Sequence, residues 1–248
     1  MHRFYLAPQQ CEGQTLVLSG REAHHALHVL RVRRGEAVSV LDGAGREFVC
    51  AVDGSDRDKL LLNVTEKKAM PAPECRITLL QAIPKAKLIE SIIQKATELG
   101  VSRVVPLLSE RVVVRLDEKE SSRKAAKWQE VAVEAIKQCG LAWLPSIEKP
   151  VTLEQFLSRK ESFELPLVAS LQPGSRHPRT YFEAFRNQHK HNPRSACIWV
   201  GPEGDFTADE IQMIQSGGAS PITLGPQVLR VETAATYCLS ILNYELSS

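Results

Sequence analysis

The stretch Ala196-Cys197-Ile198-Trp199-Val200-Gly201-Pro202-Glu203-Gly204 decides the fold, because five apolar residues end abruptly in a Gly-Pro turn. Such a run is typical of a buried strand. Thr207-Ala208-Asp209-Glu210 follows, and its spacing fits a capping box that begins a helix at Thr207. A second predicted strand, residues 222–224, breaks at Gly225-Pro226, and residues 230–235 open a last helix.

These two Gly-Pro loops predict a ligand site. We expect the two strands to be neighbours that end at one edge of a sheet, and ligands of open α/β sheets bind outside the carboxyl ends of the strands. Glycine lets the backbone approach a ligand closely, and proline stiffens the turn. One such loop is more simply a turn. Two loops carrying the charged residues Glu203, Asp205, Arg230 and Glu232 favour a functional edge.

The preceding residues alternate between strands and helices. Apolar runs predict strands at 77–83, 104–108 and 165–171, and apolar stripes predict helices over 88–99 and 128–139. This alternation argues for an α/β fold with a mostly parallel sheet covered on both faces. The polar stretch 173–194 receives no assignment.

The first 68 residues are instead rich in short strands. Tight turns separate apolar runs, and one helix is expected over residues 21–30. Several short strands with tight turns predict a small β-barrel. Residues 67–73 contain two prolines and read as an extended linker, so the domains are placed at 1–70 and 74–248. The predicted strands of the first domain are 16–18, 37–41, 47–52 and 60–64.

Basic residues gather around the predicted helix 21–30. Two interpretations stay open, a solvated basic face or a patch that contacts phosphates. The histidines lack the cysteine or carboxylate partners typical of a metal site, so no metal is expected. The group comprises Arg3, Arg21, His24, His25, His28, Arg31, Arg33 and Arg34.

Composition narrows the class of protein. The chain has 248 residues, a net charge of +2 and an apolar fraction of 43%, which suits a globular protein whose basic surface is local. Its six cysteines have no metal-ligand spacing and read as small core residues. Neither a signal peptide nor a membrane span is evident, so a reduced cytoplasm and no membrane partner are expected. Dinucleotide, Walker and G-x-S-x-G motifs are absent, and the acidic loops suit a ligand with a positive centre.

The two loops taken together resemble the signature of the bacterial 16S ribosomal RNA uridine N3-methyltransferases of the SPOUT superfamily. The residues that carry this resemblance are 200–206 and 224–234. Further matching segments occur in the same order along nearly the whole chain, at 3–5, 28–31, 94–101 and 106–111. The chain departs from the family pattern at Lys137, Leu141 and Trp143, so no RNA or dimer contact is assigned there.

This resemblance implies a fold and an activity. It implies an N-terminal PUA-like β-barrel that helps to bind RNA, and a C-terminal SPOUT domain with a trefoil knot. It further implies S-adenosylmethionine as methyl donor, a homodimer, and 16S ribosomal RNA of the small ribosomal subunit as substrate. The expected target is N3 of one uridine, at the position numbered 1498 in the reference ribosomal RNA. Two alternatives are a SPOUT methyltransferase acting on another RNA and a non-catalytic RNA-binding or ribosome-assembly protein.

The resemblance also leads to candidate site residues. Arg230 is the candidate cation that stabilises the uracil anion, with an ion pair to Glu232 or Glu203 as its structural alternative. Glu232 is the candidate base, with solvent as the alternative. The expected cofactor-binding residues are Leu171, Gly201, Pro202, Glu203, Gly204, Leu224, Gly225, Val228, Leu229, Thr233 and Ala234. The expected RNA-binding residues are Arg3, His25, Arg31, Arg33, Lys85 and Arg111.

Overall fold

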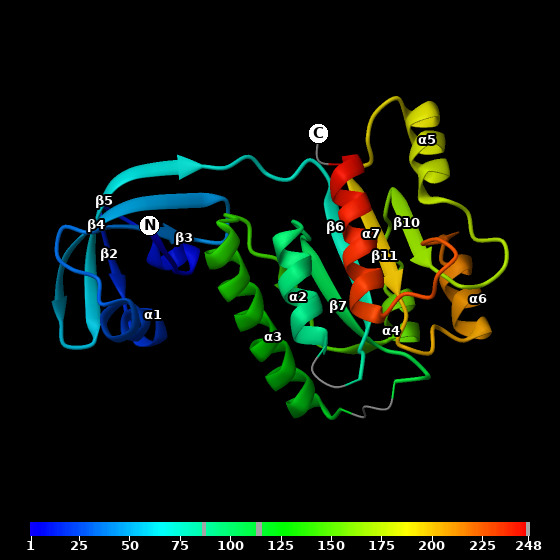
Figure 1. Cartoon of the computed structure of the whole chain (residues 1–248), viewed down its shortest axis with the longest axis horizontal. Coiled ribbons are helices and arrows are strands. Elements are labelled where there is room, and N and C mark those ends of the chain that lie inside the picture. Colours follow the sequence, from blue (N-terminus) through cyan, green and yellow to red (C-terminus); the bar gives the residue numbers. More distant parts are fainter. Residues whose placement is uncertain (86–87, 113–115, 247–248) are drawn as a thin grey trace. The chain divides into compact units, whose positions relative to one another are not determined.

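The computed structural model describes residues 1–85, 88–112 and 116–246. It divides into two compact units, which Figure 1 displays with their elements labelled. The N-terminal unit consists of residues 1–72 and 133–144, and the C-terminal unit of residues 73–132 and 145–248. A boundary drawn in the sequence at residues 70–74 cannot show that residues 133–144 group with the first unit.

The N-terminal unit is built on a five-stranded sheet. Its pairs are antiparallel except for the parallel pair β1 and β3. The four predicted strands are present, and a strand at the start of the chain is added to them. The order is β1-β3-β4-β5-β2, with bounds β1 (His2–Tyr5), β2 (Thr15–Leu18), β3 (Ala37–Leu41), β4 (Arg46–Asp56) and β5 (Lys59–Ala69).

This sheet corrects two expectations. The predicted barrel is not closed, because β1 and β2 are the two ends of the strand order and do not pair with each other among the described strands. The linker also begins later than predicted, because Lys67 and Lys68 pair with Phe48 and Glu47 in the sheet. Alternate residues of the strands, among them Phe4, Leu16 and Phe48, point into one apolar core.

The predicted helix 21–30 is present in two parts. An α-helix, α1 (Gly20–His24), continues into a π-helical segment, η2 (His25–Leu30). Ala23 and Ala26 are buried on its inner side. It ends at Arg31, whose φ of 55° lies in the left-handed region typical of a helix end. A short 3₁₀ turn, η1 (Pro8–Gln10), precedes β2.

The C-terminal unit has an α/β fold with a parallel sheet, as predicted. The strand order is β12-β10-β11-β6-β7-β8, and β9 pairs with β7 beside that path. The bounds are β6 (Arg76–Ala82), β7 (Arg103–Leu108), β8 (Ser146–Ile147), β9 (Val151–Thr152), β10 (Leu165–Ala169), β11 (Ser195–Val200) and β12 (Ser220–Ile222).

The two strands that lead into the Gly-Pro loops are not neighbours, which corrects the sequence analysis. The apolar strand β10 lies between them and pairs on both sides, with Leu165 beside Ala196 and Ala169 beside Ile222. Strand β12 also ends at Ile222, so Thr223 and Leu224 belong to the following loop. The loop after β10 is therefore flanked by the two Gly-Pro loops.

Helices cover both faces of this sheet. On one face, α7 lies over β6 and β11 and packs against α2 (Figure 1). On the other, α4 and α6 share an apolar cluster with Leu80, Trp199 and other strand residues. The bounds are α2 (Leu88–Glu98), α3 (Glu118–Cys139), α4 (Leu153–Ser158), α5 (Pro178–His189), α6 (Ala208–Ser216) and α7 (Val231–Leu246). Helix α5 occupies the polar stretch that received no assignment. Among the described helices, none is long and apolar enough to cross a bilayer.

Candidate functional site

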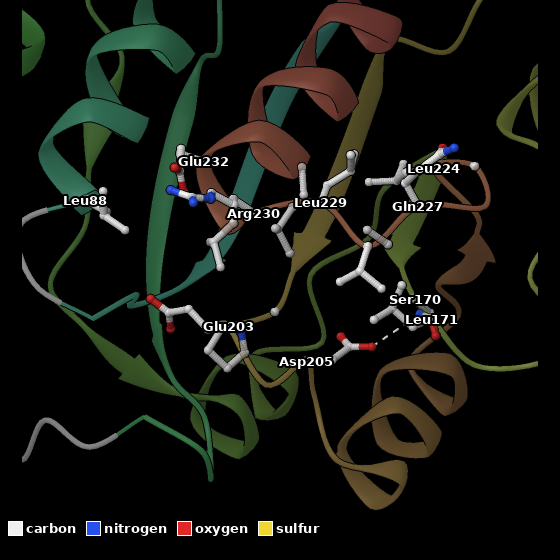
Figure 2. A pocket seen from close by; sticks show the side chains of 18 residues that line it. Leu88, Ser170, Leu171, Glu203, Asp205, Leu224, Gln227, Leu229, Arg230 and Glu232 are labelled. Atoms are coloured by element: carbon white, nitrogen blue, oxygen red, sulfur yellow. Dashed lines mark hydrogen bonds between the residues drawn. The ribbon is translucent and has the colours of Figure 1, made fainter.

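A cavity of about 510 Å³ opens at the carboxyl ends of β10, β11 and β12 (Figure 2). The loops after these three strands, the first turn of α7 and Leu88 of α2 form its wall. Its position is the one that open α/β sheets use for ligands. The lining residues are Leu88, 169–171, 200–203, Asp205, Leu224, Gly225 and 227–232, together with Ala234.

Most of the residues proposed from the sequence for cofactor binding lie on this wall. Gly204 and Thr233 lie outside the lining set. Arg230 and Glu232, the candidates for catalysis, both line the cavity. The proposed cofactor residues on the wall are Leu171, Gly201, Pro202, Glu203, Leu224, Gly225, Val228, Leu229 and Ala234.

Sequence reasoning missed several lining residues. Ser170 follows β10, and recognising β10 as the strand between the two Gly-Pro strands would have pointed to it. Asp205 carried a signal as a charge inside the first Gly-Pro loop, but no role was assigned to it. Gln227 lies inside the matching stretch 224–234, but no role was assigned to it. Leu88 had no distinguishing signal, because only the folded chain brings it to the cavity.

The first Gly-Pro loop folds tightly behind β11. The Asp205 backbone nitrogen donates to the Pro202 carbonyl oxygen at 2.9 Å. A Cβ at Gly201 would lie 2.8 Å from Asp205 Oδ1 and 2.9 Å from the Phe206 nitrogen, so a side chain there would require the loop to move. Glycine at this position is therefore a packing requirement of the loop itself.

The second Gly-Pro loop is more open. Gly225 has a φ of 112°, a conformation that favours glycine. The Gly225 backbone nitrogen donates a hydrogen bond to Thr223 Oγ1 at 3.3 Å. Val228, on this loop, is 75% exposed, and Leu171, on the loop after β10, is 63% exposed. Large apolar side chains exposed on a cavity wall offer contact to an apolar part of a ligand.

The charged groups of the cavity are three carboxylates and one guanidinium, belonging to Glu203, Asp205, Glu232 and Arg230. Glu203 Oε1 accepts a hydrogen bond from the Lys85 backbone nitrogen at 2.8 Å. Arg230 is exposed, and within the described residues its guanidinium forms no hydrogen bond or ion pair. The structure thus contains no pair of Arg230 with Glu203 or Glu232 among the residues that it describes, although the side chains share one cavity (Figure 2).

The buried carboxylate of Glu210 joins the loop after β7 to the start of α6, just after the first Gly-Pro loop. Glu210 is 4% exposed, and its Oε2 accepts from the Thr207 nitrogen at 2.9 Å while Thr207 Oγ1 accepts from the Glu210 nitrogen. The predicted capping box is therefore confirmed. Glu210 Oε1 also accepts from the Glu110 nitrogen at 2.8 Å, and the adjacent Arg111 guanidinium donates to the Gly204 carbonyl oxygen.

The remaining RNA-binding candidates belong to the N-terminal unit. Arg3 Nη1 donates to the carbonyl oxygens of Lys137 and Gln138 at 3.5 and 3.2 Å, so this guanidinium caps the end of α3. The His25 ring lies edge-on to Phe4. Arg31 and Arg33 are exposed, and their side chains form no ion pair among the residues that the structure covers.

Two of the positions that depart from the family pattern have structural partners in the same unit. Lys137 is 7% exposed, and its Nζ lies 2.7 Å from Glu22 Oε1 and 3.1 Å from Glu134 Oε1. Trp143 Nε1 donates to the Pro71 carbonyl oxygen at 2.8 Å. Leu141 is half-buried.

Comparison with protein families assigns both parts of the chain. Residues 71–243 match the RNA methyltransferase domain family, and residues 18–65 match the RNA methyltransferase PUA domain family. The first match contains every residue of the cavity wall.

Individual relatives extend the similarity over the full chain. A protein of Synechocystis named ribosomal RNA small subunit methyltransferase E is 32% identical, covering 100% of this chain and 78% of the relative. Its namesake in Bacillus subtilis is 30% identical over 99% and 97% of the two chains. A Legionella pneumophila methyltransferase solved with bound S-adenosylmethionine has a TM-score of 0.86 at 31% identity, covering 98% of this chain and 96% of its own. A ribosomal RNA small subunit methyltransferase E from Neisseria gonorrhoeae, bound to S-adenosylmethionine, has a TM-score of 0.84 at 28% identity, with 98% and 97% covered.

Proposed function

The chain belongs to the family of RNA methyltransferases that includes the ribosomal RNA small subunit methyltransferases E, and we propose that it methylates N3 of one uridine in 16S ribosomal RNA with S-adenosylmethionine as donor. The observation that carries this proposal is the cavity at the ends of β10, β11 and β12, in a fold shared with relatives solved with that donor. Three further features are proposed from the sequence resemblance: methylation at N3 of uridine, the trefoil knot and the homodimer. The N-terminal unit, whose five-stranded sheet is not closed into a barrel, is proposed to help to bind the RNA.

The cavity residues fit the donor. A volume of about 510 Å³ suits a ligand of this size. Leu171, Val228 and Leu229 supply apolar contacts, while the glycine-containing loops supply backbone groups that can hydrogen-bond to polar edges. Three carboxylates on the wall favour a ligand with positive groups. S-adenosylmethionine supplies an electrophilic methyl group on a positively charged sulfur, so its charge and the charge of the wall are complementary.

Uridine N3 carries a proton at neutral pH and is a poor nucleophile until that proton leaves. A cation near the flanking carbonyl oxygens stabilises the anion that forms, and the planar guanidinium of Arg230 has donors in a suitable fork. Its freedom from other partners among the described residues supports this role. Glu232 lines the same cavity and is the protein group proposed to accept the proton, with solvent as the alternative.

The direct test is mass spectrometry of ribosomal RNA nucleosides from cells that lack the protein. We expect N3-methyluridine to disappear from one position of 16S ribosomal RNA and to return when the wild-type chain is supplied. Loss of a methylated nucleoside from another RNA would assign a different substrate. If no modified nucleoside were lost, the protein would be a non-catalytic RNA-binding or assembly factor.

A further inference from the structure

Asp205 adopts a backbone conformation that is uncommon for residues other than glycine. Its φ is 60°, in the left-handed region where Cβ crowds the following carbonyl oxygen. Within the described residues, the other non-glycine residues with positive φ are Arg31, Arg57, Lys160 and Lys190, all exposed. Asp205 is the member of this described group that lines the cavity. Aspartate tolerates the left-handed region when its side chain can bond to nearby backbone.

The Asp205 carboxylate bonds to two different loops. Oδ1 accepts from the Phe206 backbone nitrogen at 2.8 Å, which is a bond within its own loop. Oδ2 accepts from the Leu171 backbone nitrogen at 3.2 Å, 34 residues away in the chain, and Figure 2 shows this bond as a dashed line between Asp205 and Leu171. In this left-handed conformation, one carboxylate therefore accepts from two backbone nitrogens, that of Leu171 in the loop after β10 and that of Phe206 in the loop after β11.

We propose that Asp205 is a positioning residue that clamps the loop after β10 to the loop after β11 and so holds the shape of the donor cavity. The inference rests on the proposed function, because it assigns the cavity to S-adenosylmethionine. Through the bond at its backbone nitrogen, Leu171 is held where its exposed side chain forms part of the wall. The absence of a side chain at Gly201 leaves the space through which Asp205 Oδ1 passes.

The rival explanation is that Asp205 merely closes a turn. Its backbone bond to Pro202 and its side-chain bond to Phe206 both lie within the turn, and they would persist without any contact to Leu171. The two explanations differ in what Asp205→Gly does. Glycine adopts the left-handed region freely, so this substitution removes the clamp while relieving the backbone.

We would measure S-adenosylmethionine affinity by calorimetry and thermal unfolding of the full chain for Asp205→Gly, Asp205→Asn and the control Lys190→Gly. The expected result for Asp205→Gly is a Kd weakened by roughly tenfold, the size of one lost hydrogen bond to a charged acceptor. The Tm should change little, because relief of the left-handed backbone offsets the two lost side-chain bonds. Asp205→Asn should recover part of the affinity, since its single side-chain oxygen can serve one of the two donors. Lys190→Gly relieves the same φ at the end of α5 and should leave the Kd unchanged. In methylation assays, Asp205→Gly should raise KM for the donor more than it lowers kcat.

Hydrogen exchange at the Leu171 amide tests the clamp without any ligand. Asp205→Gly should speed this exchange, and Lys190→Gly should not. Unchanged Leu171 exchange, or a wild-type Kd in Asp205→Gly, would overturn the proposal. A weakened Kd that accompanies a lowered Tm and is not recovered in Asp205→Asn would also overturn it, in favour of a purely structural turn. Failure of the wild-type chain to bind the donor would instead refute the proposed function, and the exchange result would still show whether the clamp exists.

Discussion

Arg230 stands directly before α7 with an exposed guanidinium on the cavity wall. If it stabilises charge that develops only in the transition state, Arg230→Ala should lower the single-turnover methylation rate by roughly two to three orders of magnitude. Donor affinity and Tm should change little, because the side chain has no ion pair among the described residues. Arg230→Lys should restore only part of the rate, since a point charge cannot reproduce a planar fork.

The opposite pattern would indicate a structural role. A lowered Tm together with a near-normal rate per folded molecule would mean that Arg230 forms an ion pair with Glu203 or Glu232 in solution. Both quantities should therefore be measured on the same preparation.

The glycines of the two Gly-Pro loops look alike in the sequence, but the structure gives a different reason for glycine at each position. The sequence predicts that a bulky residue at Gly225 blocks the cavity sterically. In the structure, the nearest atom to a Cβ at Gly225 is Gln227 Oε1 at 3.8 Å, so the first cost of a side chain is the φ of 112°. Gly201 is the position where the loop leaves no room. Both are glycines before a proline, and the sequence treats them alike.

At the scale of elements, the buried Glu210 fastens the start of α6 to the loop after β7. Glu210→Gln leaves one oxygen for two backbone donors, so we expect the free energy of unfolding to fall by about 2 kcal/mol. Asp209→Asn is the matched control, because Asp209 is an exposed acidic residue in the same first turn. Urea unfolding of both variants measures these free energies, and we expect the loss in Glu210→Gln to exceed that in Asp209→Asn. Equal losses would show that the charge at the helix end accounts for the effect rather than the bonds to the loop.

The exposed arginines at the end of η2 are predicted to contact phosphates of the RNA. Arg31 and Arg33 are exposed beside η2, so an Arg31→Ala/Arg33→Ala double variant should weaken binding to 16S ribosomal RNA. The slope of log Kd against log salt should fall by about two, one for each lost phosphate contact. Arg57→Ala, an exposed arginine in the turn between β4 and β5, is the control. Arg3 is left out because its guanidinium also caps α3, so its loss would confound folding with binding.

If the double variant kept both the affinity and the salt slope of the wild-type chain at physiological salt, this basic face would be merely solvated. Equal weakening in the double variant and in Arg57→Ala would indicate a general charge effect without a local contact.

Local patterns predicted some elements well and others not at all. The capping box at Thr207 and the strand over β11 depend on neighbours in the sequence, so they could be recognised. The insertion of β10 between β11 and β12 depends on pairing between distant segments, which periodicity does not encode. Helix α5 was missed because its polar face dominates its composition, although Phe182 and Phe185 are buried.

For the whole molecule, the cavity also depends on contacts between distant segments, which local sequence patterns do not predict. Four segments far apart in the sequence meet at the sheet edge, from Leu88, the end of β10, the loop after β11 and the residues before and in α7. The sequence identified the last two from their Gly-Pro motifs and Leu171 from the resemblance. Ser170 and Leu88 belong to no motif, and Gln227 lies in the second Gly-Pro loop without an assigned role, so the place of these three in the wall follows from the fold.

The buried cysteines predict how the stability of the whole molecule responds to alkaline pH. Burial raises the pKa of the Cys11 and Cys50 thiols to about 11 and that of the Cys75, Cys197 and Cys238 thiols to about 12, from a value of 9.0. Above pH 9 the unfolded chain therefore loses thiol protons that the folded chain keeps. Since the unfolded state then binds fewer protons, the free energy of unfolding must fall as pH rises. This contribution is fully present below about pH 9 and is lost as pH rises through 11 to 12.

The slope is at most about 1.4 kcal/mol per pH unit for each thiol. Cys238→Ala removes one of these groups, so its stability should fall less steeply between pH 9 and 11 than that of the wild-type chain. Cys139→Ala changes an exposed cysteine and should keep the wild-type slope. Lysine and tyrosine titration is common to all three proteins, so denaturant unfolding at several pH values isolates the thiol term as the difference between the variants. Identical slopes in Cys238→Ala and Cys139→Ala would show that the interior does not hold this thiol in its neutral form.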